Sequence, residues 1–288
     1  MNIGFIGLGI MGAPMAGHLI GAGHSLFLKT RRSVPEALLE AGGTACATAA
    51  EVAERSDTII LMLPDTPDVE QVLFGAGGVV EGLSPGKTVI DMSSIAPLAT
   101  KDFAARVAAR ACAYLDAPVS GGVRRAVDGT LAILVGGEAD LLARWRPVLE
   151  VMGTSVLHIG PAGSGHAAKA LNNFVSAAGL LATVEALHVA QRFGIAPEAM
   201  TDVLNASSGR SNTSENKVKQ FMLSGSFASG FSLKLMDKDL GIAGALAQSV
   251  DYPLGFGRHC IETWHAIAGA VGPTADHTEM YRLLAEGA

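Results

Sequence analysis

Three glycines near the start of the chain have the spacing of a dinucleotide-binding turn. Gly7, Gly9 and Gly12 form a GxGxxG motif between an apolar run and a helical pattern. In such a turn the first glycine permits the bend, the second lets the backbone approach a pyrophosphate, and the third lets the helix pack against the strand. N–H groups at the helix start and the helix dipole then bind the phosphates. The context predicts a dinucleotide site formed by Gly7, Leu8, Gly9, Ile10, Met11 and Gly12.

A second candidate region follows the next predicted strand, at Thr30, Arg31 and Arg32. Sites that prefer NAD usually place Asp or Glu there, roughly 20 residues after the glycines, to bind the ribose hydroxyls. This chain has no acidic residue in that place. Two guanidinium groups and a hydroxyl suit a 2′-phosphate through bidentate hydrogen bonds. The pattern favours NADP(H) over NAD(H), with a solvated basic turn as the alternative.

Lys169 is the ionisable residue with the most suggestive neighbours. Asn172 follows it by three residues and Asn173 by four, so a helix would place both carboxamides beside it. A lysine among carboxamides near a domain junction can donate a proton to a substrate oxygen. The alternative is a lysine whose ammonium reaches water, with an asparagine that caps a turn.

Two further segments end predicted strands with residues that bind anions or cofactors. Ser120, Gly121 and Gly122 offer a hydroxyl and backbone N–H groups that together can hold a carboxylate. An ordinary turn has the same composition and is the alternative. Residues 91–94 (Asp-Met-Ser-Ser) end another strand, where the cofactor lies in a doubly wound sheet.

A parallel sheet with crossover helices would bring these segments to one edge. Strands are expected near residues 2–6, 25–28, 57–64, 87–91, 114–119, 130–135 and 155–159, and helices near 13–20, 35–41, 49–54 and 99–110. The alternation predicts an α/β Rossmann domain, with a doubly wound and mostly parallel sheet whose ligands bind at the carboxyl ends of its strands.

The pattern changes after a loop expected at residues 160–165. The loop resembles a phosphate loop in composition, but His166 stands where such a loop has Lys. Beyond it no segment predicts a strand, and helices are expected near 166–193, 197–206, 214–224, 235–249 and 255–270. We therefore expect a Rossmann domain over residues 1–162 and an all-α domain over residues 163–288.

Composition argues against several other classes of protein. The net charge of −6 disfavours nucleic acid as a partner. The long apolar stretch at residues 174–190 contains Glu185 and His188, so we interpret it as a buried helix rather than a membrane span. The first strand leaves no room for a signal peptide, and scattered cysteines favour a reducing compartment, which predicts a cytoplasmic protein. No metal site is expected, because no His or Cys cluster has ligand spacing.

Together the segments resemble the β-hydroxyacid dehydrogenase family, which includes 3-hydroxyisobutyrate dehydrogenase and tartronate semialdehyde reductase. The matching pieces occur in family order over nearly the whole chain. They are residues 4–12 (GFIGLGIMG), 91–94 (DMSS), 116–122 (DAPVSGG), 129–131 (GTL), 169–173 (KALNN) and 238–240 (KDL). The combination is far more specific than any single piece.

The resemblance implies a role for each segment. Lys169 would be the catalytic general acid/base, with Ser120–Gly122 binding the substrate carboxylate and Asn173, together with Asn172, fixing the substrate. The cofactor would be lined by Ser94 and the Leu63–Pro64 turn and reached by Lys238 from the second domain. The helical domain of this family often builds a dimer or tetramer, so the resemblance implies a homodimer or homotetramer.

The implied reaction is hydride transfer between a nicotinamide and C3 of a small 3-hydroxy acid or its semialdehyde. Two alternatives remain: an imine or broad carbonyl reductase, whose imine-reducing members usually lack the lysine, and a non-catalytic nucleotide sensor or scaffold. The chain departs from many relatives at residues 30–32, where they have Asn-Arg-Thr. Residues 207–217 lie where relatives vary and substrate selection is expected.

Overall fold

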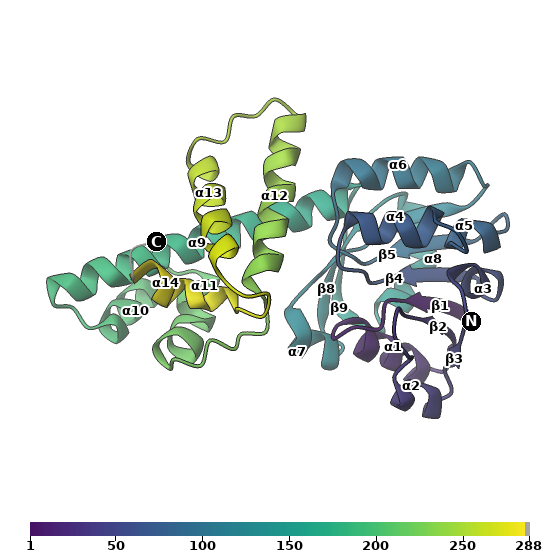
Figure 1. The fold of residues 1–288 in the computed structure, drawn as a ribbon, viewed down its shortest axis with the longest axis horizontal. Coiled ribbons are helices and arrows are strands. Elements are labelled where there is room, and N and C mark those ends of the chain that lie inside the picture. The colour runs from purple at the N-terminus through teal and green to yellow at the C-terminus, as the bar shows by residue number, and fades with distance from the viewer. Residues whose placement is uncertain (286–288) are drawn as a thin grey trace. The chain divides into compact units, whose positions relative to one another are not determined.

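The computed structural model describes residues 1–285, which divide into two compact units. Met1–Lys169 form the first unit, and the second begins at Ala170. The first unit is a nine-stranded sheet with helices on both faces (Figure 1). Its elements are β1 (Asn2–Ile6), α1 (Gly12–Gly21), β2 (Ser25–Lys29), α2 (Glu36–Glu40), β3 (Thr44–Ala45), α3 (Ala49–Glu54), β4 (Thr58–Leu61), α4 (Thr66–Phe74), α5 (Val79–Gly82), β5 (Thr88–Asp91), α6 (Pro97–Ala108), β6 (Ala113–Asp116), β7 (Val119–Ser120), α7 (Gly122–Val127), β8 (Leu131–Gly136), α8 (Ala139–Leu149) and β9 (Gly153–Gly160).

The strand order is β3-β2-β1-β4-β5-β6-β8-β7, and β9 pairs with β8. The first six strands in this order are parallel to one another, β8 runs antiparallel to β6 and β7, and β9 is parallel to β8. The prediction of a doubly wound, mostly parallel sheet is therefore confirmed. Because the carboxyl ends of parallel strands meet at one edge, the segments after β1, β4, β5 and β6 lie together there.

Alternating strand residues divide the apolar core between the two faces of this sheet. In β4, Ile60 contributes to the cluster under α1 and α8, whereas Ile59 and Leu61 contribute to the cluster under α3, α4 and α6. Both sets are fully buried. Such uninterrupted apolar strands are typical of a parallel sheet that is covered by helices on both sides. Burial on both faces therefore explains the absence of alternating polar residues in β4.

Several details of the first unit differ from expectation. The single strand expected at residues 114–119 is broken into β6 and β7, because Pro118 has no N–H for a ladder and only its carbonyl is bonded, by Leu134 N–H at 3.0 Å. The expected loop at residues 160–165 is shorter, since Gly160 ends β9 and the next helix begins at Ser164. Helices α4, α5, α7 and α8 were not predicted.

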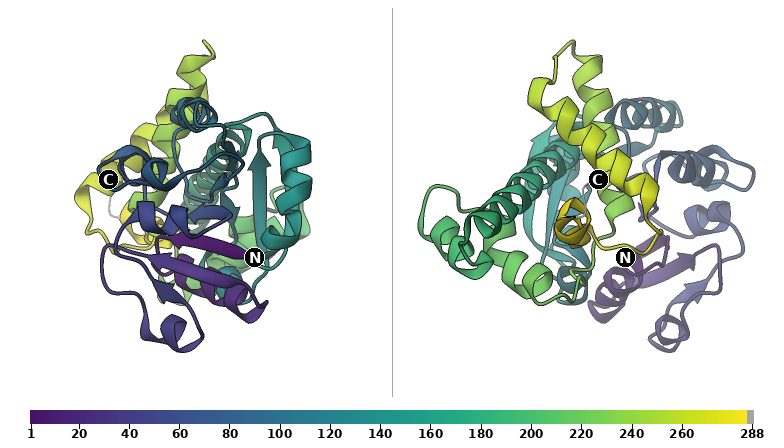
Figure 2. Two further views of the ribbon diagram at one scale, coloured as in Figure 1. Left: turned by 90° about the vertical axis from the view of Figure 1, so that its right-hand side faces the viewer. Right: turned by 60° about the vertical axis from the view of Figure 1, so that its left-hand side comes forward.

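The second unit is helical (Figure 2). Its elements are the continuation of α9 (Ser164–Phe193), α10 (Pro197–Ala206), α11 (Asn212–Asn216), a π-helical turn η1 (Val218–Leu223), α12 (Leu233–Ser249), α13 (Gly255–Ala270), a 3₁₀ turn η2 (His277–Glu279) and α14 (Met280–Ala285). No strand occurs in this unit within the described residues, as predicted. The helix expected at residues 214–224 is instead α11 followed by the π-helical turn.

The core of this unit forms where α9 packs against α12 and α13, which run side by side (Figure 2). Leu180, Val184 and Leu187 of α9 are fully buried there, as is Trp264 of α13. Within residues 1–285, α9 alone is long and apolar enough to cross a membrane. A core helix passes the same test, and the buried face of α9 agrees with the buried-helix interpretation.

Candidate functional site

The glycine turn has the geometry expected of its three positions. Gly7 has φ +103°, and a Cβ there would lie 2.2 Å from the Met62 carbonyl oxygen. A Cβ at Gly12 would lie 1.9 Å from the Gly7 carbonyl oxygen, so the start of α1 could not approach β1. A Cβ at Gly9 would meet no protein atom within 4 Å. The protein itself thus requires glycine at positions 7 and 12, whereas Gly9 faces open space that suits a pyrophosphate.

The segments after β4 and β5 meet beside this turn. The Leu63 N–H donates to Ser93 Oγ at 3.0 Å, which joins the Leu63–Pro64 turn to the loop containing Ser94. The Ser93 N–H in turn donates to Asp91 Oδ1 at 3.0 Å. These contacts place the predicted cofactor-lining residues at the carboxyl edge of the sheet, next to Gly7.

The Ser120–Gly122 turn lies in the same unit and joins β7 to α7. Gly121 and Gly122 both have positive φ, +131° and +69°, which only glycine adopts readily. No protein atom lies within 4 Å of a Cβ built on Gly122. His18 of α1 contacts the carbonyl oxygens of Ala126 and Val127 at the end of α7, at 3.1 and 3.0 Å. The turn therefore leads into α7, which packs against α1, the helix that follows the glycine turn.

The first turn of α9 is fastened to two strand ends by residues whose role the sequence did not reveal. Asp116, the last residue of β6, is fully buried and accepts hydrogen bonds from the N–H groups of Gly163 (2.8 Å) and His166 (3.0 Å). The buried His166 ring contacts the Ser93 carbonyl oxygen at 3.0 Å and Thr100 Oγ1 at 2.7 Å. Because Lys169 lies one turn later, these bonds fix its position relative to the Ser93–Ser94 loop.

Lys169 and Asn173 are buried, with 8% and 6% of their surface exposed, and they lie one turn apart on α9. Asn173 Nδ2 donates to Asp239 Oδ2 at 2.6 Å, and Asp239 Oδ1 pairs with Lys238 Nζ at 3.2 Å. Asp239 therefore links two predicted site residues, although the sequence pointed only to its neighbour. Asn172 is exposed and donates to Asn173 Oδ1 at 3.3 Å.

The basic turn after β2 is exposed at Arg31 and Arg32, and Thr30 is half-buried. The Arg31 guanidinium forms an ion pair with Asp68 of α4. A pair with an exposed partner contributes little to stability, so Arg31 can exchange Asp68 for another anion at small cost.

A clamp in the second unit holds the segment that leads into α12. The Asp276 carboxylate accepts hydrogen bonds from Ser229 Oγ (2.8 Å), Gly230 N (2.9 Å) and Thr278 N (2.9 Å). His277 N–H and Nδ1 both contact the Phe231 carbonyl oxygen at 2.9 Å. Since α12 begins one residue after the Ser232 cap and carries Lys238 and Asp239, the clamp positions both residues.

Burial and the nearby Lys217 charge lower the pKa of His277 to about 4. Burial would also raise the pKa of Asp276, but hydrogen bonds from Thr278 and Ser229 lower it on balance. The folded protein therefore keeps His277 neutral beside an ionised Asp276.

The clamp predicts a loss of stability in mild acid. Between pH 6.5 and 4 the unfolded chain binds a proton at His277 that the folded chain refuses, so the free energy of unfolding should fall by about 3 kcal/mol across that window. In His277→Asn the amide can still donate to the Phe231 carbonyl oxygen, but it does not titrate. The dependence of the free energy of unfolding on pH that comes from His277 should therefore vanish. Urea unfolding at several pH values measures it, with the exposed His259→Asn as control. An unchanged slope in His277→Asn would contradict the assignment.

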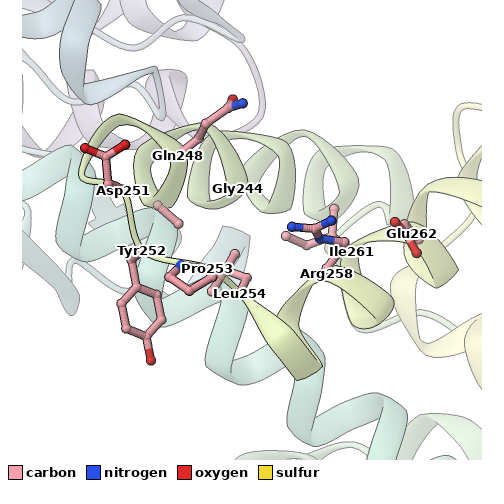
Figure 3. A pocket seen from close by; sticks show the side chains of 10 residues that line it. Gly244, Gln248, Asp251, Tyr252, Pro253, Leu254, Arg258, Ile261 and Glu262 are labelled. Atoms are coloured by element: carbon pink, nitrogen blue, oxygen red, sulfur yellow. The ribbon is translucent and has the colours of Figure 1, made fainter.

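A hollow of about 580 Å³ lies between α12 and α13 (Figure 3). Gln248, Asp251, Tyr252, Arg258 and Glu262 are among its lining residues, and none of the predicted site residues is. This hollow is therefore separate from the predicted site residues. In the part of the chain that the structure describes, no group of three or more His, Cys, Asp or Glu side chains is arranged to hold a metal ion.

Two family models together match nearly the whole chain. Residues 2–160 match the family described as "NAD binding domain of 6-phosphogluconate dehydrogenase", and residues 163–284 match the family described as "NAD-binding of NADP-dependent 3-hydroxyisobutyrate dehydrogenase". The chain is 39% identical to 2-hydroxy-3-oxopropionate reductase of Escherichia coli, over 99% of this chain and 97% of that one. It is 38% identical to 2-(hydroxymethyl)glutarate dehydrogenase of Eubacterium barkeri, over 88% and 85%.

Among solved structures, 3-hydroxyisobutyrate dehydrogenase of Mycobacterium tuberculosis superimposes with a TM-score of 0.90 at 32% identity, covering 98% of each chain. Imine reductases also share the fold, with a TM-score of 0.67 at 20% identity for the one from Myxococcus stipitatus. The three relatives named above that are more than 30% identical are all oxidoreductases by name. The chain therefore belongs to the β-hydroxyacid dehydrogenase family and is an NAD(P)-dependent oxidoreductase.

Proposed function

We propose that the protein transfers a hydride between a nicotinamide and C3 of a small 3-hydroxy acid or its semialdehyde, with Lys169 as the general acid/base. One observation carries the proposal: Asp116 and His166 fasten the start of α9, and hence Lys169, to the same edge of the sheet as the glycine turn. A sensor of nucleotides needs the turn alone. A buried lysine fixed at that edge is what proton transfer requires.

In this proposal each group of site residues has one role in binding or proton transfer. The Gly7–Gly12 turn and the first N–H groups of α1 bind the pyrophosphate, and Leu63, Pro64, Ser94 and Lys238 line the rest of the cofactor. The nicotinamide, when bound, supplies or accepts the hydride. Ser120, Gly121 and Gly122 bind the substrate carboxylate, and Asn173 with Asn172 orients the substrate. Lys169 Nζ gives a proton to the carbonyl oxygen in reduction and takes it back in oxidation.

Asp239 is a further residue with a role in the proposed site. One oxygen of its carboxylate accepts a hydrogen bond from Asn173 Nδ2, and the other forms an ion pair with Lys238 Nζ. Asp239 therefore fixes the proposed substrate-binding Asn173 relative to the proposed cofactor-binding Lys238. Such second contacts lock the rotamers of groups that must be placed within fractions of an ångström. Asp239 is therefore a positioning residue in this proposal.

A panel of carbonyl compounds tests the proposed function. NADPH or NADH oxidation should be observed with short semialdehydes and not with cyclic imines, and the reverse reaction should be observed with 3-hydroxy acids. The names of two relatives, 2-hydroxy-3-oxopropionate reductase and 2-(hydroxymethyl)glutarate dehydrogenase, refer to compounds of this class. Turnover of imines alone would favour an imine reductase, and binding of cofactor without turnover of any compound would favour a sensor.

We further propose NADP(H) as the preferred cofactor, supported by the two arginines after β2 and the missing carboxylate there. A solved neighbour that is 26% identical, Psf3, contains NADP+. The Arg31–Asp68 pair keeps a guanidinium near the place where a 2′-phosphate would lie.

Replacing Arg31 and Arg32 together with alanine should weaken NADPH binding much more than NADH binding. Each charge-assisted contact to the phosphate contributes roughly 1.5–3 kcal/mol, which is roughly 10- to 100-fold in Kd. Fluorescence titration of both cofactors measures the difference, with the exposed Arg192→Ala as control. Equal losses for the two cofactors would show that the arginines do not read the phosphate, and NAD would be preferred.

We propose residues 1–162 as the cofactor domain and residues 163–288 as the substrate and oligomerisation domain of a cytoplasmic homodimer or homotetramer. Large exposed apolar side chains on α9 support the assembly, since Val175, Val189 and Phe193 are 68%, 69% and 83% exposed. Light scattering of the purified protein tests it, and a monomeric mass at micromolar concentration would overturn it.

A further inference from the structure

The proposed carboxylate turn, Ser120–Gly122, lies between two very short elements of the first unit. β7 is two residues long and pairs with β8 through Val119 and Ser120, and α7 has six residues. Between them Gly121 and Gly122 have φ values of +131° and +69°. Glycine loses more conformational freedom on folding than any other residue, and a helix of this length is not stable alone. The shape of the turn therefore depends on contacts that hold the far end of α7.

The last four carbonyl groups of α7 all have hydrogen-bond partners. The carbonyls of Arg124 and Arg125 accept from backbone N–H groups in the loop after α7, at 2.9 Å each. The carbonyls of Ala126 and Val127 lie 3.1 and 3.0 Å from Nε2 of His18 in α1. Because a carbonyl oxygen can only accept, Nε2 carries the hydrogen. His18 thus supplies the donor that the end of a helix lacks within itself.

The half-buried His18 ring is held in place from two sides. On one side Ala16 and Leu19 of α1 are fully buried in the core that also contains Ala126 of α7. On the other side the ring lies against Gly129, where a Cβ would come within 3.3 Å of His18 Cε1. Gly129 also has φ +67°, a conformation that favours glycine. The ring therefore has a fixed place between α1 and the loop after α7.

These contacts join two helices that begin at different parts of the proposed site. α1 follows the glycine turn of the pyrophosphate site, and α7 follows the carboxylate turn, all within the first unit. Six residues of α-helix span about 9 Å, so a small rotation of α7 at its far end displaces the turn. A misplacement of about 1 Å in a group that orients a substrate can lower a rate roughly a hundredfold.

We propose that His18 is a positioning residue for the substrate carboxylate: it holds α7 so that the donors of the Ser120–Gly122 turn stay directed at the anion. The inference rests on the proposed function, because it takes this turn to bind the carboxylate. His18 itself touches neither substrate nor cofactor. Its loss should therefore weaken the preference for carboxylate-bearing substrates and leave the affinity for the cofactor unchanged, since Gly7 and Gly12 keep their packing.

The ratio of kcat/KM for a semialdehyde to kcat/KM for the simple aldehyde of equal length tests this role. His18→Leu removes the donor, and we expect the ratio to fall roughly 10-fold, the effect of one hydrogen bond to a charged group. His18→Gln keeps an N–H donor at about the reach of Nε2 and should restore most of the native ratio. The matched control is His24→Leu, which removes a half-buried histidine three residues past the end of α1 and should leave the ratio unchanged.

An equilibrium measurement tests the same role without turnover. NADPH and a 3-hydroxy acid are both in the reduced form and do not react, so their binding to the enzyme can be titrated together. For His18→Leu the Kd of 3-hydroxypropanoate for the NADPH complex should rise roughly 10-fold, whereas the Kd of NADPH alone should stay native. His18→Gln should bind both compounds as the native enzyme does.

The possible results separate a positioning role from a structural one. A native ratio in folded His18→Leu would overturn the inference. An equal fall of kcat/KM for both aldehydes, or weaker binding of NADPH alone, would overturn it as well, because either would show a general loss of structure. If His18→Leu does not fold, His18→Phe keeps a ring against Gly129 without the donor and takes its place. Absence of any preference for the carboxylate in the native enzyme would overturn the proposed role of the turn, and the inference with it.

Discussion

Lys169→Ala should lose nearly all turnover and still bind the cofactor. A positioned general acid contributes roughly 10²- to 10⁴-fold to a rate, and no other lysine follows Lys169 on α9. The cofactor turn at Gly7–Gly12 depends on glycines that pack against Met62 and against each other. Removing an amino group from α9 leaves that packing intact.

Steady-state kinetics and NADPH titration of the same preparation measure the two effects. Lys101→Ala, which removes an exposed lysine from α6, is the matched control and should be indistinguishable from the native enzyme. A folded Lys169→Ala protein with nearly native kcat would remove this residue from the mechanism. A loss of NADPH binding as large as the loss of kcat would show that the lysine serves the cofactor instead.

The second large effect concerns the substrate carboxylate. Aldehydes or alcohols that lack it should show a kcat/KM at least about a hundredfold lower than their carboxylate-bearing counterparts, because the donors of the Ser120–Gly122 turn would be left unpaired. Gly122 faces open space, and both glycines of the turn have a conformation that other residues rarely adopt. The turn therefore has room and donors for an anion.

The measurement compares each semialdehyde with the simple aldehyde of equal length. Ser120→Ala should narrow the difference in kcat/KM by removing one donor, whereas Ser84→Ala, an exposed serine just before the start of β5, should not change it. Equal rates on both members of each pair would make the turn purely structural and would favour a carbonyl reductase of broader scope.

Local patterns were sufficient for the parts of the fold that depend on nearest neighbours. The β1–turn–α1 unit was predictable because each glycine answers a steric demand within a few residues, as the contacts of Gly7 and Gly12 show. The helix at residues 255–270 was predicted with its observed bounds. By contrast, α8 contains Pro147 and α7 begins at Gly122 directly after Gly121, so local propensity argues against both helices. Packing on the sheet overrides it, through Trp145 and Ala126.

The candidate site was predictable only in part, for a related reason. Lys169, Asn173 and Ser120 belong to short motifs, whereas His166, Asp116 and Asp239 act through contacts between residues that are 47 to 73 positions apart. Nothing in the spacing of a single sequence encodes such partners. Nor could a 3.6-residue pattern show that residues 214–224 break at Lys217 into a π-helical turn.

The fastening of α9 has a consequence for how such chains recombine in evolution. The two family matches meet at residues 160–163, which makes this short segment the natural point for exchanging one half of the gene. An exchange there would bring in a new Gly163, His166 and Lys169 but retain the old Ser93 and Asp116. A hybrid would keep Lys169 in place only if the start of α9 from one parent could form the hydrogen bonds to Asp116 of the other parent. Position 116 and positions 163–166 should therefore be inherited, and should change, as one unit.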